Sequence, residues 1–106
     1  MFARRVAVNL KPNSVAEFTK KLEKEIIPLL RKQKGFKDEI TLVGPGGTRA
    51  FGISFWDRAE DAEAYNRASY ADVTKMLTGV VEGSPQVETY EVSNSTFHKI
   101  AAAMAA

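Results

Sequence analysis

The segment RAFGISFWDRAEDAEAY, from Arg49 to Tyr65, carries the clearest structural pattern in this 106-residue sequence. Its first half alternates between two sets of side chains, as residues do on the two faces of a strand. One face has Phe51, Ile53 and Phe55, and the other has Ala50, Gly52 and Ser54. After Trp56, Asp57 is placed to cap a helix, and Glu60 stands where a capping-box partner belongs. The segment therefore predicts a strand that leads directly into a helix.

Three more strands are predicted around this segment, at Phe2–Leu10, Phe36–Gly44 and Gln86–Ser93. The first strand has Val6, Val8 and Leu10 on one face and Arg5, Ala7 and Asn9 on the other. The second strand has Phe36, Ile40 and Leu42 on one face. A Pro-Gly-Gly turn at residues 45–47 then predicts a hairpin between the second and third strands.

A first helix is predicted from a cap at Ser14 to about Lys34, because apolar residues recur at every third or fourth position. Pro28 lies inside this helix and removes one backbone hydrogen bond, so we expect a kink or a break near Glu25. Gly35 is suited to end the helix in the left-handed conformation.

The second helix, which follows Trp56, is expected to be interrupted at Ser69 and Tyr70 and to end at residues 83–85. The order β-α-β-β-α-β predicts an α+β, ferredoxin-like sandwich with an antiparallel four-stranded sheet. We expect a single domain over residues 1–100 and a frayed C-terminal tail over residues 101–106.

The composition is that of an ordinary globular protein, with 44% hydrophobic and 26% charged residues. There is no cysteine, which excludes disulfides, thiolate metal sites and a cysteine nucleophile. The formal charge of +2 is too small to indicate a polyanionic partner. No signal peptide and no membrane-spanning run is recognisable, and we expect a cytoplasmic location.

The predicted third strand has no strongly polar face, which is typical of a strand buried on both sides. Two helices that cover one face of the sheet leave the other face open. A homodimer with two-fold symmetry, in which the open sheet faces pack together, would bury both sides.

Three segments carry a resemblance to known proteins: ISFWDRAEDAEAY (Ile53–Tyr65), KQKGFKDEI (Lys32–Ile40) and TYEVSNSTF (Thr89–Phe97). Together they resemble the dimeric α+β barrel superfamily and, within it, domains of the antibiotic biosynthesis monooxygenase (ABM) type. The resemblance covers roughly residues 1–97. It implies a homodimer with facing sheets and a ligand cleft between the sheet and the helices of each subunit.

Heme-degrading members of the superfamily use an asparagine on the first strand with a tryptophan and a histidine on the second helix. Asn9 stands at a suitable place on the first strand. The tryptophan position falls at Tyr65 and the histidine position near Lys75, so the axial imidazole is missing. We therefore reject heme degradation as the leading hypothesis.

Cofactor-free members oxidise phenolic compounds to quinones, and polar and aromatic groups bind the substrate and favour its anion. On this resemblance we predict Trp56, Tyr65 and Asn9 as catalytic residues and Tyr70, Arg67, Phe51 and His98 as ligand-binding residues. Each has a structural alternative. Trp56 and Tyr65 could serve packing, Arg67 could be a solvated charge, and Asn9 could serve the turn that follows it. His98 is the only histidine and is included because a swapped C-terminal segment could bring it to the partner's cleft.

Metal binding is disfavoured, because the carboxylates near Asp57 crowd one helix start and complement its dipole. We expect neither a metal nor another cofactor. RNA binding is a minor alternative, since RNA-recognition motifs have the same element order. They need aromatic residues where Val6 and Ile53 stand, and only Phe51 provides one. We therefore expect no nucleic-acid partner and no membrane.

The leading hypothesis is an ABM-like protein that acts as a cofactor-independent monooxygenase on a small aromatic or quinone-type compound. The alternative is a dimeric protein that binds a small ligand, or is associated with stress, without catalysis. The cleft is expected beside Trp56 and Tyr65.

Overall fold

The structure is a computed structural model that describes residues 1–100. The prediction of a frayed tail over residues 101–106 lies outside the described residues. The elements, in chain order, are β1 (Phe2–Leu10), α1 (Val15–Lys21), η1 (Leu22–Ile26), α2 (Ile27–Arg31), β2 (Phe36–Val43), β3 (Arg49–Trp56), α3 (Ala59–Ala68), α4 (Tyr70–Leu77) and β4 (Val81–Glu91). The four strands form one antiparallel sheet in the order β2-β3-β1-β4. The predicted ferredoxin-like fold is confirmed.

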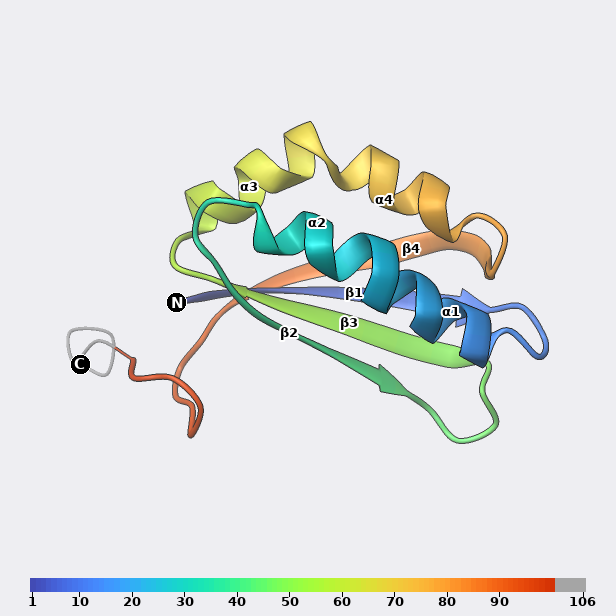
Figure 1. The fold of residues 1–106 in the computed structure, drawn as a ribbon. Coiled ribbons are helices and arrows are strands. Elements are labelled where there is room, and N and C mark those ends of the chain that lie inside the picture. Colours follow the sequence, from blue (N-terminus) through green and yellow to red (C-terminus); the bar gives the residue numbers. More distant parts are fainter. Residues whose placement is uncertain (101–106) are drawn as a thin grey trace.

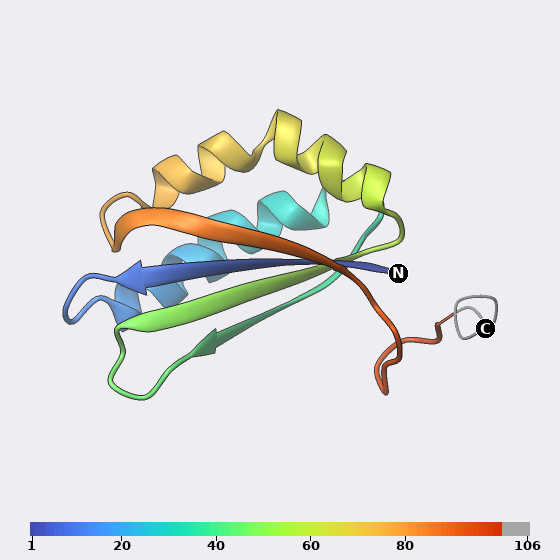
Figure 2. The ribbon, with the colours of Figure 1, turned by 180° about the vertical axis from the view of Figure 1, so that it is seen from behind.

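The helices lie on one face of the sheet, and the other face carries no helix (Figures 1 and 2). We call the first the covered face; it includes Arg4, Val6 and Val8 of β1 and Gly52, Ser54 and Trp56 of β3. We call the second the open face; it includes Ala3, Arg5 and Ala7 of β1 and Phe51, Ile53 and Phe55 of β3. Figure 1 also shows that the chain after β4 runs on toward the open side of the sheet.

The hydrophobic core lies between the covered face and the helices. Trp56 is completely buried at the end of β3, where its ring stacks on Tyr65 of α3 at 5.2 Å and meets Phe36 edge-on at 5.5 Å. Phe18, Ile26 and Leu30 contribute the apolar stripe of the first helical segment. Val73 and Leu77 do the same for α4. This packing holds both helical segments against the covered face of the sheet.

The first helical segment contains the irregularity that Pro28 predicts. Residues Leu22–Ile26 form a π-helical turn between α1 and α2, and the N–H of Ile27 donates to the carbonyl of Leu22. Because Pro28 has no N–H, the chain cannot continue an unbroken α-helical ladder through this turn. The segment ends at Arg31, three residues earlier than predicted, and Gly35 has the expected positive φ of 79°.

The second helix is divided as expected, into α3 and α4, with Ser69 between them. The predicted cap is wrong by one residue: Arg58, in an extended conformation, precedes the first helical residue Ala59. Asp57 instead forms an ion pair with Lys37, at 3.2 Å. Its backbone N–H donates to the carbonyl of Gly35. Asp57 thus ties the helix start to the chain that leads into β2.

The predicted face assignment of β2 is also wrong in part. A register shift between Phe36 and Asp38 puts Phe36 beside Trp56 on the covered face. Ile40 pairs with Ile53 and Leu42 with Phe51, so both lie on the open face. An irregularity in a strand inverts the alternation on either side of it, and the sequence pattern alone does not reveal it.

Strand β4 begins at Val81, five residues earlier than predicted. Residues 83–85 do not end the preceding helix but lie inside this strand. Ala7 pairs with Gln86 and Asn9 with Glu82, so the chain bulges at Gly83–Pro85. Proline is tolerated there because a residue in a bulge of an edge strand does not have to donate a backbone hydrogen bond to the neighbouring strand.

Candidate functional site

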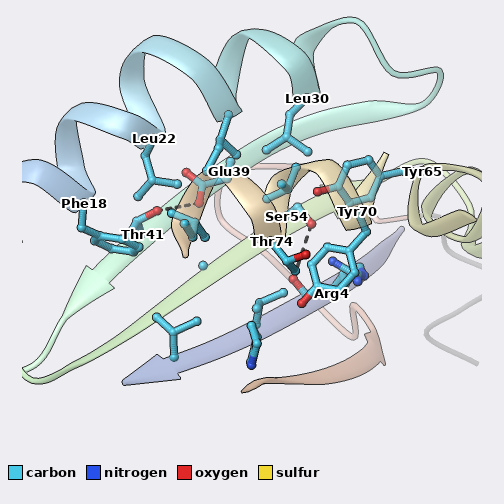
Figure 3. A pocket seen from close by; sticks show the side chains of 17 residues that line it. Arg4, Phe18, Leu22, Leu30, Glu39, Thr41, Ser54, Tyr65, Tyr70 and Thr74 are labelled. Carbon is cyan, nitrogen blue, oxygen red and sulfur yellow. Dashed lines mark hydrogen bonds between the residues drawn. The ribbon is translucent and has the colours of Figure 1, made fainter. Parts of the chain in front are cut away.

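A cavity of about 70 Å³ lies between the covered face of the sheet and the helices (Figure 3). Its walls are mostly apolar and come from all four strands and from α1, η1, α2, α3 and α4. The polar or ionisable side chains among them are Arg4, Glu39, Thr41, Ser54, Tyr65, Tyr70 and Thr74. An apolar cavity with a few converging polar groups is the usual form of a small-molecule site.

Arg4 is the most unusual of these residues, because its guanidinium is buried without a carboxylate. Its exposed fraction is 4%, and no acidic side chain among residues 1–100 forms an ion pair with it. One nitrogen donates to Asn66 Oδ1 at 2.8 Å. The guanidinium carbon also lies over two aromatic rings, 4.1 Å from the centre of the Tyr70 ring and 5.4 Å from the centre of the Tyr65 ring. The aromatic rings offset part of the desolvation cost and leave the positive charge uncompensated.

The remaining donors of Arg4 are available to a ligand. A guanidinium carries five N–H donors, and the protein supplies one hydrogen-bond acceptor. No fully buried side-chain nitrogen or oxygen in the described part of the chain lacks a partner. The nitrogens of Arg4 without a protein partner must therefore reach accessible space, and Arg4 lines the cavity.

Glu39 is the carboxylate of the cavity. Burial raises its pKa, and a hydrogen bond from the Thr41 hydroxyl at 2.6 Å lowers it in part. Its carboxylate lies above Gly52 of β3, where a Cβ would come within 3.3 Å of Oε2. The missing side chain at Gly52 thus leaves the space that the carboxylate and the cavity share.

Tyr65 and Tyr70 form the aromatic end of the cavity, with ring centres 6.4 Å apart. Burial, followed by the neighbouring Tyr70, raises the pKa of Tyr65 to about 12, although Arg4 acts in the opposite direction. Tyr65 therefore stays protonated at neutral pH and can donate a hydrogen bond but cannot act as a base. Trp56 supports it from behind by ring stacking.

Searches against solved structures find this fold in several ABM proteins. A monooxygenase from Streptomyces coelicolor in complex with nanaomycin D superposes with a TM-score of 0.76, at 14% identity over 92% of each chain. A proposed antibiotic biosynthesis monooxygenase from Bordetella bronchiseptica gives 0.73 at 14% identity, over 86% of this chain and 95% of that one. A protein of unknown function from Nitrosomonas europaea gives 0.73 at 17% identity, over 95% and 94%.

The chain has an ABM-like fold. No protein-family model matches its sequence, and no curated protein matches it either. At these identities the ABM-like fold is shared, while the residues of the site have to be judged from their own geometry.

The structure brings three of the predicted site residues together. Tyr65 and Tyr70 line the cavity, and Trp56 packs behind Tyr65 without lining it. The indole N–H of Trp56 donates to Ser54 Oγ at 2.9 Å. The cavity thus adjoins Tyr65, and Trp56 contacts it only through the Tyr65 ring. The catalytic roles of these residues stay predictions.

The other four predicted residues lie elsewhere. Asn9 is exposed on the open face, opposite Arg49, at the end of β1 far from Trp56. Arg67 is exposed on α3. Phe51 lies on the open face beneath the Arg5 guanidinium, at 4.2 Å. His98 also lies on that side, where Nε2 is 2.7 Å from Asp38 Oδ2 and the ring is 6.3 Å from Phe55.

Sequence reasoning missed Arg4 and Glu39, for different reasons. Arg4 precedes Val6 by two positions, so the alternation already placed a charge on the apolar face of β1. The alternation from Phe36 places Glu39 on the face opposite to Phe36, and the register shift in β2 turns it instead toward the covered face.

Residues 1–100 hold no group of three or more His, Cys, Asp or Glu side chains arranged to bind a metal ion. No helix in the same range combines the length and apolarity that crossing a membrane requires.

Proposed function

We propose that this protein is a cofactor-independent monooxygenase that oxidises a small phenol or quinol to a quinone. The observation that carries the proposal is the buried guanidinium of Arg4, which has no carboxylate partner and faces a mostly apolar cavity. Such a charge favours the anionic form of a bound ligand, because low polarity strengthens the attraction. The ABM-like fold supports the assignment, as does the binding of nanaomycin D by the monooxygenase from Streptomyces coelicolor.

The reaction needs only the organic substrate and dioxygen. A phenolate gives up electrons to dioxygen far more readily than the neutral phenol does, so stabilising the anion promotes the first step. Overall, the ring loses its hydroxyl hydrogen and the hydrogen of one ring carbon. A carbon–oxygen bond forms at that carbon and the O–O bond breaks. One oxygen atom becomes the new carbonyl and the other leaves as water, which balances the four electrons.

The chain's own residues would perform binding and charge stabilisation. Arg4 stabilises the negative charge of the bound anion through its free N–H donors. Tyr65 remains protonated and offers a further donor at the aromatic end of the cavity. Trp56 fixes the Tyr65 ring by stacking, so it supports the site without touching the ligand.

We also propose a cytoplasmic homodimer in which two open faces pack together. Large apolar side chains on this face are substantially exposed in one chain, including Ile40 at 41% and Leu42 at 45%. Tyr90 on β4 extends the same surface. An apolar surface of this kind favours association. Gel filtration with light scattering should give twice the chain mass at micromolar concentration, and a monomer would contradict the dimer.

Oxygen uptake tests the proposed activity. The purified protein, treated with chelator and free of flavin, is incubated with a panel of phenols, hydroquinones and naphthols in an oxygen-electrode cell. We expect uptake with formation of a quinone that carries one more oxygen atom than the substrate, together with water and little hydrogen peroxide. Arg4→Met should abolish it, whereas Arg5→Met, a change of the neighbouring residue on the other face, should not.

The alternative is a protein that binds a small ligand without catalysis. It predicts binding of a phenol, detected by calorimetry, with no oxygen uptake for any compound of the panel. Absence of nucleic-acid binding is a further prediction; a salt-dependent mobility shift with single-stranded RNA would contradict it.

A further inference from the structure

Three polar residues cross the covered face in a single row. Glu39 of β2 pairs with Ser54 of β3, and Ser54 pairs with Arg4 of β1. All three line the cavity (Figure 3). Neighbouring strands are about 4.8 Å apart, so the backbones of Glu39 and Arg4 are separated by roughly 10 Å. An acid and a cation thus enter the cavity from opposite sides of β3.

The two charged groups do not neutralise each other. No ion pair joins Glu39 and Arg4. The shift in the Glu39 pKa comes from burial and from Thr41, with no contribution from Arg4. The only other ionisable side chains of the cavity are Tyr65 and Tyr70. The cavity therefore has a proton acceptor at one side and an unpaired cation at the other.

We infer that Glu39 accepts the proton of the bound ligand, and that the ligand is a single-ring phenol with a conjugated acceptor group that faces Arg4. The O–H bond of the phenol breaks and a new O–H bond forms on the Glu39 carboxylate. The electron pair that is left behind delocalises across the ring toward the acceptor, where Arg4 stabilises it. Conjugation between the two ends of the ligand is required because the base and the cation lie on different sides.

The enclosed part of the cavity is smaller than one aromatic ring, since a cavity of about 150 Å³ accepts benzene and this one measures about 70 Å³. The ligand can therefore be no larger than a single ring at this point, and part of that ring must project from the cavity. A surface depression of about 350 Å³ adjoins it and shares Thr74, Leu77 and Pro85 with its lining. Substituents of the ring would extend into this depression beside the β4 bulge. A fused-ring compound cannot be enclosed in the inner cavity.

The inference concerns binding and proton transfer; its role in oxidation rests on the proposed function. The test uses 4-nitrophenol, which has a hydroxyl and a conjugated nitro group at opposite ends of one ring. Binding to the purified protein is measured anaerobically by calorimetry, at a pH above the pKa of the probe. Titrations in two buffers of different ionisation enthalpy count the protons exchanged on binding.

The free protein then has an ionised Glu39, and the probe arrives as an anion. In the complex, the Glu39 carboxylate and the phenolate oxygen repel each other unless a proton lies between them. The wild type should therefore take up about one proton from solvent per bound probe. Its affinity should fall about tenfold for each further pH unit. Glu39→Gln should take up no proton and bind with an affinity independent of pH. Asp38→Asn, which removes the neighbouring carboxylate on the open face, should behave as the wild type does.

A second variant guards against a folding defect in Glu39→Gln. Thr41→Val removes the hydrogen bond that lowers the pKa of Glu39, so proton uptake should persist and the affinity at each pH should exceed that of the wild type. The inference is overturned if the wild type does not bind the probe, or if Glu39→Gln takes up the same number of protons. Proton uptake without any oxygen uptake would refute the proposed oxidation and leave the proton acceptor in place.

Discussion

Arg4 and Arg5 are neighbours in one strand, and their surroundings differ completely. Arg5, on the open face, forms an ion pair with Glu88 across the β1–β4 ladder and lies over the Phe51 ring. Arg4, on the covered face, has the deeper position and no carboxylate. A partly exposed arginine with an acidic partner needs no further explanation. A buried arginine without one indicates that something else supplies the negative charge.

The acids of β2 repeat this contrast. Asp38 faces the open side and pairs with His98, whereas Glu39 faces the cavity and has only a hydroxyl for a partner. Each face of the sheet therefore carries an arginine of β1 and an acid of β2 at neighbouring positions. On the open face both of these residues have an oppositely charged or ionisable partner from the protein, and on the covered face neither has. The covered face therefore carries the candidate site.

The largest expected effect comes from replacing each of the two acids by its amide. Glu39→Gln removes the proton acceptor and should lower kcat for oxidation of a phenol roughly 100-fold to 10,000-fold, the usual contribution of a positioned acid or base. Asp38→Asn should change kcat by less than about twofold, since surface substitutions rarely act at a distance. Steady-state oxygen uptake measures both. Equal losses in the two variants would remove the distinction between the faces.

Much of this architecture could be predicted from the sequence. Alternation at Phe51–Phe55 and the turn at residues 45–47 are local signals, and both strands of the hairpin were placed correctly. Pro28 is a local signal too, and it predicts the irregular turn in the first helix. The register shift in β2 depends on how that strand meets β3, so no local pattern reveals it. Because the shift decides which face Glu39 occupies, one half of the site could not be predicted.

The second prediction concerns the two arginines. Arg4→Met should weaken binding of 4-nitrophenolate roughly 10-fold to 150-fold, because hydrogen bonds to charged groups contribute about 1.5–3 kcal/mol. Arg5→Met leaves the cavity unchanged and should preserve the affinity. Calorimetry provides the dissociation constants, and thermal unfolding verifies that both variants are folded. Stronger binding by Arg4→Met would show that the cavity prefers a neutral ligand.

A smaller effect is expected at Gly52, between the two charged residues. Gly52→Ala places a methyl group 3.3 Å from Glu39 Oε2 and displaces the carboxylate slightly. We expect a loss of affinity for 4-nitrophenolate of roughly fivefold, about 1 kcal/mol, near the lower limit for added volume in a packed site. Gly79→Ala is a matched control, because a Cβ there meets nothing within 4 Å. Similar losses in the two variants would place the ligand away from Gly52.

The smallest effect is on stability and follows from the environment of Glu39. Burial raises the pKa of this carboxyl above its ordinary value of 4.5, so the folded state holds the proton more firmly than the unfolded state does. The favourable contribution is complete below that ordinary value and is lost as the pH rises through the raised pKa. At neutral pH the ionised carboxylate therefore destabilises the fold. Glutamine does not titrate and keeps an oxygen that can accept the Thr41 hydrogen bond.

Urea unfolding of Glu39→Gln and the wild type between about pH 4 and pH 7 measures this difference. The free energy of unfolding of the variant should rise relative to the wild type as the pH increases, and then level off. The free energy of unfolding of Thr41→Val should be lower than that of the wild type at neutral pH, because the carboxylate of Glu39 loses its one hydrogen bond. A gain in stability that accompanies the loss of turnover would identify Glu39 as a residue retained for its chemistry. A difference that stays constant with pH would mean that the carboxylate is solvated, and the contrast between the two faces would then rest on Arg4 alone.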